Sequence, residues 1–544
     1  MRASLALILA AALAVPLAAQ EAASSRPSAL LRVAGDAQGT ATALADPALV
    51  QRYQATITPD ELAGHLYVYA SDFLAGRDTG APGQRFAALY LAGQYRQMGI
   101  APKGRVTETT PYGLRAYTQP FMLERNALRS YTVTATRGGE TLLTSTLAPD
   151  VDSPVAFVPV GSGSVSDASP APLLYGGYAS SVVEAGLDVM GAVVLIRPGS
   201  PENPSDRGIT QAAVDALSAA GARAVVVPFA PAASALARMA SGALRGGRLT
   251  LPEPGASSGA PMLLTGMDVA EQLVGSLDAA TVGPTGVMLA IEADQSTEQV
   301  ETENVLAFIP GSDPVLRDEV VVISAHLDHV GTRDVADSED GIYNGADDDG
   351  SGTVTMLEIA EAFETARLDG HGPRRSILFL HVTGEEKGLL GSRYYADMDP
   401  VLPLANTVAD LNIDMIGRYD PERGFDTTDY VYIIGADLIS QDIADWNAAV
   451  NTTTGTDLLL SDRFNSPDDP NQFFRRSDHW NFGKHDIPFI FYFTGTHEDY
   501  HQPGDSADKI DYDRMARIGR LIFGTAWEIA NRDERPAVSG EGFN

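Results

Sequence analysis

The feature that most constrains the fold is the position of histidine and carboxylate residues relative to apolar runs that are typical of strands. Each candidate metal ligand follows directly on, or lies just beyond, such a run. The runs and their residues are 320–325 with His326, 376–382 with Glu385 and Glu386, 408–413 with Asp414, and 488–493 with His501. In open α/β sheets, ligands gather at the carboxyl ends of the strands. The sequence therefore predicts one site at such a sheet edge.

From residue 304 onward, strand patterns alternate with helical patterns, which is typical of the α/β class. We predict a mixed, mostly parallel sheet flanked by helices. The expected strands are 320–325, 376–382, 407–415, 430–434 and 488–493. The expected helices are 353–366, 388–395, 439–450 and 514–531.

Residues 50–150 read as the N-terminal part of this α/β domain, which continues over 298–535. Within 50–150 we expect helices over 58–99 and a strand at 131–136. Residues 151–297 are interpreted as an inserted, β-rich α/β accessory domain. Its expected elements are strands 192–196 and 221–227 and helices 211–220 and 267–277, with residues 261–264 leading into the second helix. The block carries no candidate ligand, so we expect it to cover the pocket mouth and to be separable from the chemistry.

The first 20 residues combine Arg2, a short apolar run and small residues, which is typical of an export signal. We expect a periplasmic or secreted protein with no membrane span. There is no cysteine, so no disulfide stabilises the fold. With 71 acidic against 38 basic residues, the net charge is -33. Such a charge repels polyanions, so we expect no nucleic-acid partner. The sequence does not indicate an oligomeric state.

The residue types indicate a divalent transition metal, which needs neutral imidazole and ionised carboxylate ligands together. In His326-Leu327-Asp328 the two polar side chains face the same way on a strand, so Asp328 is expected to accept the free N–H of His326. A calcium loop around Gly350 is excluded, because its last ligand position would fall on Met356. Three adjacent carboxylates at 347–349 repel one another unless a cation lies nearby.

Glu385 and Glu386 are adjacent, so their side chains point in different directions and can divide the chemistry. One can bind metal while the other takes a proton from a metal-bound water. Taken alone, such a pair reads as a solvated helix start that the helix dipole stabilises. The other ligand-type segments favour the catalytic interpretation.

These segments resemble, in order and type, the motifs of the dizinc aminopeptidase family, whose relatives include glutamate carboxypeptidase II and the zinc glutaminyl cyclases. The matching motifs are His326-x-Asp328, 345–352, Gly384-Glu385-Glu386, Asp414-Met415-Ile416-Gly417 and Tyr500-His501. Residues 73–80 resemble the family's N-terminal segment more weakly. Residues 191–195 and 219–222 resemble the protease-associated domain that is inserted in many members.

The resemblance implies two Zn²⁺ per chain and a role for each ligand. One zinc would take His326 and Asp414, the other Glu386 and His501, and Asp348 would bridge the two. Glu385 would be the general base for a metal-bridged hydroxide, and Tyr500 would steady the oxyanion. The family also has a cis peptide after the bridging aspartate. Asp478 and His479 resemble a further family segment near the pocket and are expected to have structural or substrate-wall roles.

We expect an exported, zinc-dependent aminopeptidase that acts on peptides, because a site ringed by carboxylates favours a protonated substrate amine. A carboxypeptidase or dipeptidase of the same family stays open, since Arg463, Arg475 and Arg476 offer cations for an α-carboxylate. A non-catalytic binding protein would predict lost ligands, and none is lost. A glutaminyl cyclase would predict a single zinc, whereas both half-sites are complete.

Overall fold

The computed structural model describes residues 44, 46–107, 113–148, 155–160, 168–229, 236, 239, 244, 247–252, 260–333, 340–466 and 469–539. The predicted export signal at 1–20 lies outside the described residues, as does the expected boundary between residues 150 and 151. None of the helices in the described ranges qualifies as a membrane span.

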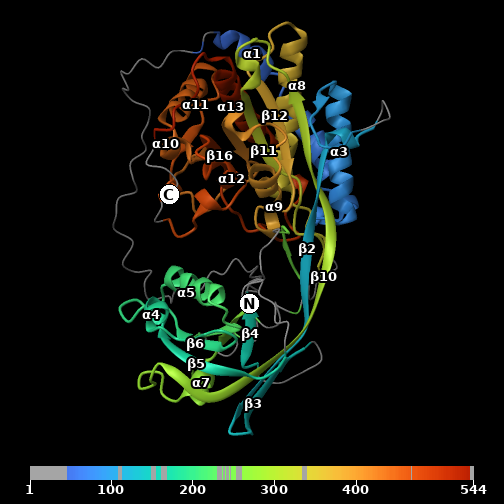
Figure 1. Ribbon diagram of the computed structural model, residues 1–544. Coiled ribbons are helices and arrows are strands. Elements are labelled where there is room, and N and C mark those ends of the chain that lie inside the picture. Colours follow the sequence, from blue (N-terminus) through green and yellow to red (C-terminus); the bar gives the residue numbers. More distant parts are fainter. Residues whose placement is uncertain are drawn as a thin grey trace.

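One continuous sheet of the described strands runs through both halves of the molecule (Figure 1). We call residues 46–117 and 304–539 the larger half, and 131–229 with 260–293 the smaller half. Along the sheet the strands follow the order β15-β14-β16-β13-β11-β12-β10-β5-β6-β7-β9-β4. Most neighbours on this path are parallel. The prediction of a mixed, mostly parallel sheet flanked by helices is therefore confirmed.

The centre of the larger half is a set of parallel strands whose residues are all buried. They are β11 (Val320–His326), β12 (Ser376–Val382), β13 (Thr407–Ile413) and β16 (Phe489–Phe493). Strands covered on both faces read as continuous apolar runs, which is why the sequence predicts them well. At the edge, β14 (Tyr430–Ile434) is antiparallel to β16 and parallel to β15 (Leu459–Ser461).

Helices cover both faces of this sheet. On one face, Val321 and Ile323 pack in a large core with several helices, among them α2 (Pro59–Tyr69), α8 (Gly352–Leu368), α11 (Gln441–Thr453) and α13 (Tyr512–Asn531). On the other face, Val322 packs with Tyr395 and with Phe482 of α12 (Trp480–Gly483). The further helices of this half are α1 (Pro47–Gln54), α3 (Pro82–Met98), α9 (Leu390–Arg393) and α10 (Ala436–Ile439).

Local signals explain several helix ends. Thr58 caps α2 by accepting the N–H of Glu61, and its hydroxyl donates to the Glu61 carboxylate, with Pro59 as the first helical residue. The expected single helix at 439–450 is instead α10 followed by α11, because Ser440 has an extended backbone conformation. The expected helix at 388–395 begins only at Leu390, after a 3-10 turn over Glu385–Lys387.

The smaller half has its own sheet segment and its own two hydrophobic cores. Its strands are β3 (Glu140–Leu147), β4 (Phe157–Val160), β5 (Ala171–Tyr178), β6 (Val193–Arg197), β7 (Ala224–Pro228) and β9 (Met262–Thr265). Its helices include α4 (Ala179–Val182), α5 (Arg207–Ala219) and α7 (Met267–Val274).

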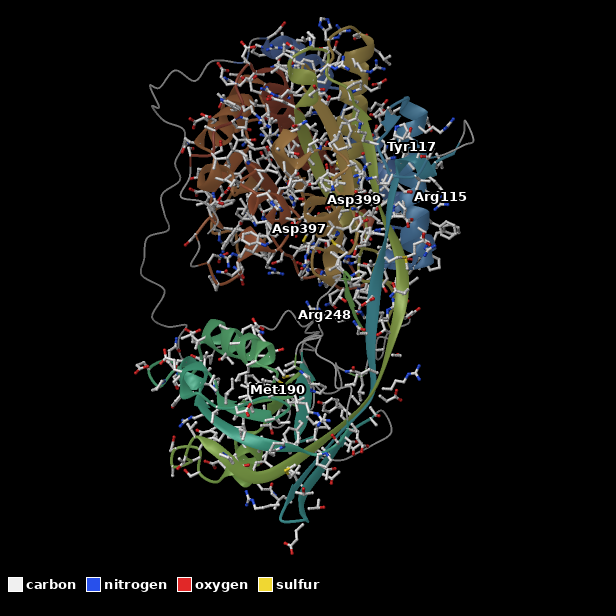
Figure 2. All side chains as sticks on the ribbon, viewed as in Figure 1. Arg115, Tyr117, Met190, Arg248, Asp397 and Asp399 are labelled. Carbon is white, nitrogen blue, oxygen red and sulfur yellow. The ribbon has the colours of Figure 1, made fainter. Side chains whose placement is uncertain are left out.

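Two long antiparallel strands, β2 (Thr118–Arg137) and β10 (Gly283–Ile309), link the halves (Figure 1). The sequence-based interpretation found only part of β2 and placed a domain boundary at 297, inside β10. The middle of β10, from Asp294 to Gln299, is polar on both faces, so it carries no apolar alternation. A short strand, β8 (Arg248–Thr250), pairs with β2, and its Arg248 lies between the halves (Figure 2). The two-residue strand β1 (Ala101–Pro102) pairs with β10.

Candidate metal centre

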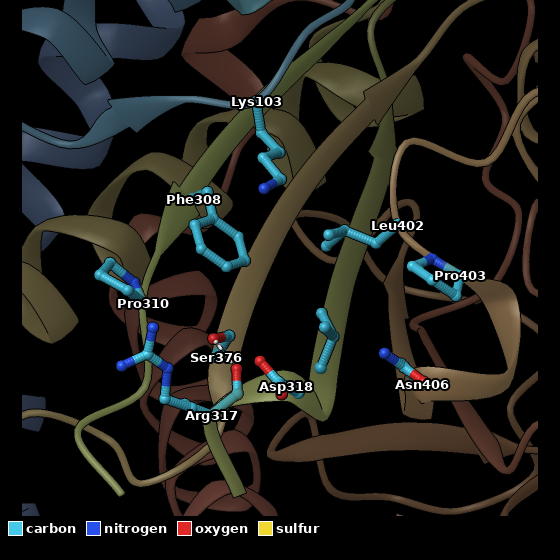
Figure 3. A pocket seen from close by; sticks show the side chains of 10 residues that line it. Lys103, Phe308, Pro310, Arg317, Asp318, Ser376, Leu402, Pro403 and Asn406 are labelled. Atoms are coloured by element: carbon cyan, nitrogen blue, oxygen red, sulfur yellow. Dashed lines mark hydrogen bonds between the residues drawn. The ribbon is translucent and has the colours of Figure 1, made fainter. Parts of the chain in front are cut away.

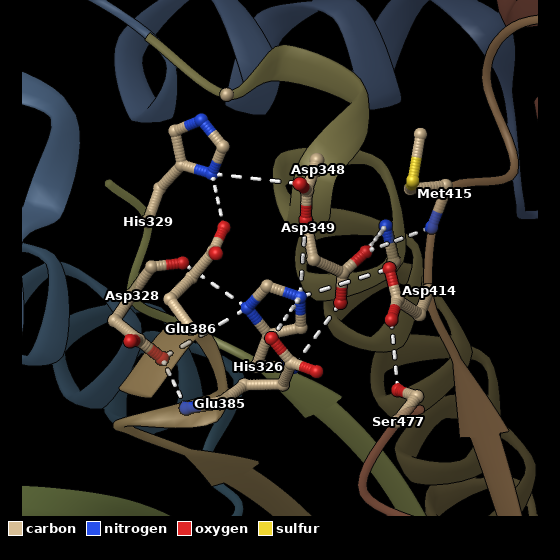
Figure 4. Close-up of polar contacts among 12 residues, drawn as sticks. His326, Asp328, His329, Asp348, Asp349, Glu385, Glu386, Asp414, Met415 and Ser477 are labelled. Carbon is tan, nitrogen blue, oxygen red and sulfur yellow. Dashed lines mark hydrogen bonds and ion pairs between the residues drawn. The ribbon is translucent and has the colours of Figure 1, made fainter. Parts of the chain in front are cut away.

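The carboxyl ends of β11, β12, β13 and β16 meet at one edge of the larger half. The predicted ligands His326, Asp348, Glu386 and Asp414 lie together there (Figure 4), and His501 contacts two of them. His326 is the last residue of β11, and Asp414 follows β13 directly. Strand order therefore explains why residues far apart in sequence become neighbours.

Two groups of donor atoms share Asp348. In the first, His326 Nε2 lies 3.2 Å from Asp348 Oδ1 and 3.6 Å from Asp414 Oδ1. In the second, His501 Nε2 lies 2.9 Å from Asp348 Oδ2 and 3.1 Å from Glu386 Oε2. All five residues for which the sequence predicts a ligand role are thus brought together, in the grouping that the family resemblance implies.

Several of these donors are buried without a hydrogen-bond partner among the described residues. They are His326 Nε2, Asp348 Oδ2, Glu386 Oε1 and Asp414 Oδ1. Unpaired buried polar atoms are costly, and carboxylates at this spacing repel one another. Cations between them would satisfy the oxygens and the ring nitrogens together. The donor set of imidazole and carboxylate therefore fits two divalent metal ions of the zinc type.

Glu385 and Glu386 have contrasting environments although they are adjacent. Burial raises the pKa of the Glu385 carboxyl well above its usual value. Burial also acts to raise the pKa of Glu386, but the neighbouring His501 and His329 together hold it below its usual range. Glu385 Oε2 lies 4.0 Å from His326 Nε2, at the margin of the donor groups. Environments that separate two carboxyl pKa values in this way mark different chemical roles.

The contacts of Asp328 differ from the prediction that its carboxylate accepts the ring N–H of His326. The ring donates from Nδ1 to the backbone carbonyl oxygen of Asp328 at 3.1 Å, while the carboxylate lies 3.9 Å away. That bond still leaves Nε2 free to bind a metal. The carboxylate instead accepts the Thr79 hydroxyl at 2.7 Å and the Glu385 N–H at 3.2 Å. Asp328 therefore positions the Glu385 backbone.

The three consecutive aspartates have three different surroundings, and the Asp348–Asp349 peptide is cis, as the resemblance implies. The Asp349 carboxylate accepts the N–H groups of His326, Gly352 and Met415 and so ties β11, α8 and the end of β13 together. Although Asp349 lies near His326 and Asp414, these bonds already occupy its oxygens. The sequence-based interpretation gave it no role of this kind.

Asp347 and Asp505 fix the backbone of the same turn from the other side. The Asp505 carboxylate accepts the N–H groups of Asp347 and Asp348 at 3.0–3.1 Å. The Asp347 carboxylate accepts the Gly417 N–H at 2.6 Å and lies 3.3 Å from His497 Nε2. Sequence patterns gave no signal for Asp505 or His497, because their partners come from a distant loop.

Tyr500 stacks on the ring of His501, with 3.9 Å between the ring centroids, and its hydroxyl lies 3.4 Å from Arg476 Nη2. The other two arginines considered for carboxylate binding are engaged elsewhere. Arg463 pairs with Asp420, and Arg475 lies over the rings of Phe474 and Trp480. Arg476 is therefore the arginine of the three that lies beside Tyr500.

Asp478 and His479 lie outside both donor groups. The Asp478 carboxylate accepts the Ser392 hydroxyl at 2.5 Å. His479 donates from Nε2 to the Phe474 carbonyl oxygen at 2.9 Å, and its ring packs against Phe489 and Phe491. Burial lowers the pKa of His479 to about 3, so the ring stays neutral. Such contacts are typical of residues that hold the wall of a site in place.

His329 is a neighbour of the site that the sequence-based interpretation passed over. Its Nδ1 lies 2.8 Å from Glu386 Oε1 and 3.7 Å from Asp348 Oδ2, and the residue is fully buried. The available signal was a second histidine three residues after His326, in His326-Leu327-Asp328-His329.

A separate hollow of about 370 Å³ lies at the opposite end of the strands (Figure 3). Its lining includes Val320 and Ser376, the first residues of β11 and β12, together with Lys103 and Phe308. A strand of this length spans about 20 Å. The hollow is therefore remote from the donor groups and takes no part in their chemistry.

Residues 304–526 match the family model of peptidase family M28. These residues belong to that family. The prediction of a metallopeptidase domain is thereby confirmed, and the M28 domain contains all five predicted ligands together with Glu385 and Tyr500. Because the matched range begins in β10, the match says nothing of the smaller half.

Curated relatives with metallopeptidase names also match this chain. A "Probable zinc metalloprotease" of Pyrenophora teres f. teres (strain 0-1) is 29% identical over 277 residues, which cover 44% of this chain and 53% of the relative. "Aminopeptidase YwaD" of Bacillus subtilis (strain 168) is 26% identical over 224 residues, 40% of this chain and 43% of the relative. The chain thus spans about half the length of the curated relatives that it matches.

The fold as a whole resembles that of an aminopeptidase from Aneurinibacillus sp. strain AM-1. The TM-score is 0.53 at 19% identity, and the match covers 90% of this chain and 98% of that one. At this identity the likeness concerns the fold alone. It extends beyond the M28 domain, since 90% of the chain includes much of the smaller half.

Proposed function

We propose that this protein is a zinc-dependent aminopeptidase that removes N-terminal residues from peptides. The observation that carries the proposal is the pair of donor groups that share Asp348, with buried and otherwise unpaired donor atoms. The M28 family assignment supports it, as do the relatives, which include an aminopeptidase and zinc metalloproteases.

Two zinc ions per chain fit the donor groups. His326 and Asp414 would hold one, Glu386 and His501 would hold the other, and Asp348 would contribute one oxygen to each. When bound, the metal ions would supply Lewis acidity that polarises the scissile carbonyl and activates the attacking water. The protein fixes these donors through the bonds from Asp349, Asp505 and the Asp328 carbonyl described above.

Glu385 is the proposed general base. Its carboxylate stands at the margin of the donor groups, and the bond from its N–H to Asp328 fixes its backbone. It would take the proton of the attacking water and return it to the leaving amine. Tyr500 would donate its hydroxyl hydrogen bond to the oxyanion, supported by its stack on His501 and by Arg476.

The direction of attack follows from charge. Carboxylates surround the donor groups, whereas Arg476 is the single arginine beside Tyr500 among those considered. This excess of negative over positive charge favours a protonated α-amino group near the metals over an α-carboxylate. A carboxypeptidase or dipeptidase of the same family is the alternative, because Arg476 provides one cation for a carboxylate.

The test compares matched substrates. An amino-acyl amide with a free amine should be cleaved, and its N-acetylated twin should not. A C-terminally amidated peptide should still lose residues from its N-terminus, detected by mass spectrometry. Cleavage that requires a free α-carboxylate would overturn the aminopeptidase assignment in favour of the carboxypeptidase.

A metal count separates the remaining alternatives. Chelation should abolish hydrolysis, and zinc should restore it with two ions per chain. A single zinc with conversion of N-terminal glutamine would indicate a glutaminyl cyclase. Two bound ions with no hydrolysis of any peptide in a broad panel would indicate a binding protein.

Two further proposals concern the rest of the chain. We propose that residues 1–20 direct export, so that the enzyme works in the periplasm or outside the cell. Fractionation of cells that express the full chain, with N-terminal sequencing of the product, tests this.

We also propose that residues 151–297 form a protease-associated-like accessory domain that limits substrate size.

A further inference from the structure

His329 follows the metal-ligand strand β11, and its ring is held in place from two sides. Its backbone N–H donates to the Arg77 carbonyl oxygen at 3.2 Å, beside the bridge between Asp78 and His329. On the other side the ring lies against Gly345, where an added Cβ would come within 2.6 Å of ring atoms. Gly345 also has φ of +57°, so glycine suits both the turn and the close approach. These contacts fix the position of the His329 ring.

One ring nitrogen of His329 and one of His326 each lie close to a carboxylate oxygen. His329 Nδ1 is 2.8 Å from a Glu386 oxygen, yet it makes no well-directed hydrogen bond with any described residue. His326 Nε2 is likewise 3.2 Å from an Asp348 oxygen without such a bond. Each nitrogen therefore lies among carboxylate oxygens without pointing at one of them. A lone pair directed at a shared point between the oxygens explains this geometry (Figure 4).

Four donor residues surround one such point: His329, Asp348, Glu386 and His501, whose donor atoms all lie within 4.8 Å of one another. The shortest separations are 2.8, 2.9 and 3.1 Å, and His329 Nδ1 lies 3.7 Å from Asp348 Oδ2. Donors at about 2.0–2.2 Å from a tetrahedral zinc are about 3.3–3.6 Å apart. The arrangement is therefore of the right size for one metal ion.

We propose that His329 is a fourth protein ligand, through Nδ1, of the metal ion held by Glu386, His501 and Asp348. This rests on the proposed function, which places a metal there. The other position has three protein donors, from His326, Asp414 and Asp348. The two positions are consequently unequal: the one with His329 binds its ion more tightly and fills first.

The competing role for His329 is a hydrogen bond from Nδ1–H to the Glu386 carboxylate, with no contact to metal. Scalar coupling separates the two roles, because it passes only through a metal–nitrogen bond. The protein is loaded with an NMR-active cadmium isotope and labelled with nitrogen isotope in its histidines. We expect coupling at Nδ1 of His329 and at Nε2 of His326 and of His501.

Coupling at His326 and His501 with none at His329 would overturn the proposal and leave the dizinc assignment intact. Absence of coupling at all three histidines, with cadmium in excess, would overturn both. The two failures are thus distinguishable without any activity measurement.

Calorimetric titration of the metal-free protein with zinc gives a second readout. Removing a group that orients a metal ligand usually lowers the metal affinity about 10–100-fold. Removing a ligand itself should therefore lower the affinity of the tighter site by about 100-fold or more. His329→Gln should show this loss, whereas the matched change His371→Gln at an exposed histidine should not. A His329→Gln protein that binds both ions as the unmodified protein does would overturn the proposal.

Discussion

Leu249 of strand β8 and Leu390 of helix α9 lie in one buried hydrophobic cluster. Leu390 is close in the chain to the Glu385–Lys387 turn, and its N–H donates to the Gly384 carbonyl oxygen at 2.9 Å. Leu249 belongs to the block 151–297, which was expected to be separable from the chemistry. The block therefore reaches the turn that carries the proposed general base, and replacing all of 155–297 would remove this support.

Leu249→Ala should lower kcat more than it raises KM. The change leaves a cavity beside Leu390, and a shift of the Glu385 turn by about 1 Å can cost about 100-fold in rate. Steady-state kinetics on an amino-acyl amide measure this. Leu277→Ala, in the same block but in a different core, is the matched control and should leave kcat unchanged. Equal effects of the two variants would show that only the stability of the block matters.

Glu385→Gln should keep both metal ions and lose about 10²–10⁴-fold in kcat, because an amide cannot take up a proton. Glu386→Gln should instead lose affinity for one ion, since an amide oxygen is a weaker ligand than a carboxylate. Metal content after dialysis and kcat are measured for both. If the effects are interchanged, the two glutamates have exchanged roles.

Asp505→Asn should lower the affinity for both metal ions by about 10–100-fold, because this is the usual effect of losing a group that orients metal ligands. The asparagine amide would face the N–H groups of Asp347 and Asp348, which the carboxylate now accepts. Zinc titration of the metal-free protein measures the affinities. Asp508→Asn removes the same charge at an exposed position nearby and should have no effect.

The contribution of His479 to the free energy of unfolding should fall as the pH is lowered below about 6.5. Burial lowers the pKa of the folded residue to about 3, whereas an unfolded histidine titrates near 6.5. Between these values only the unfolded chain binds the proton, so His479 contributes a slope of about 1.4 kcal/mol per pH unit. Denaturant unfolding of metal-free protein at several pH values measures this.

His479→Gln keeps a side-chain N–H for the Phe474 carbonyl but does not titrate, so its stability should depend less on pH. His381, whose pKa burial also lowers to about 3, remains in this variant and supplies the residual slope. An unchanged slope would show that His479 is not neutral in the folded protein.

Sequence patterns predict the buried strands best. The expected bounds 376–382 and 430–434 coincide with β12 and β14, because strands buried on both faces leave continuous apolar runs. The long strands β2 and β10 were incomplete or absent in the prediction. Their central parts are solvated on both faces, and pairing with each other rather than burial stabilises them.

The candidate site shows the same division between local pattern and tertiary contact. His326 and Glu386 follow apolar runs, so strand ends alone locate them. The role of Asp328 was predicted from a two-residue spacing that assumes a continuing strand, but β11 ends at His326, and the ring meets the Asp328 carbonyl instead. The role of Asp505 depends on where a distant loop returns, which no local pattern records, whereas the spacing of His329 from His326 was a local signal.

The two-stranded ribbon of β2 and β10 can convert a small bend into a larger displacement of the smaller half. The pairing of the two strands shifts register between Asp294 and Gln295, and β10 extends from there back to Gly283. At about 3.4 Å per residue this arm is about 40 Å long, so a bend of about 5° at the register shift displaces its far end by about 3 Å. Small changes in strand twist would thus be amplified into changes in the distance between the smaller half and the turn that carries Glu385.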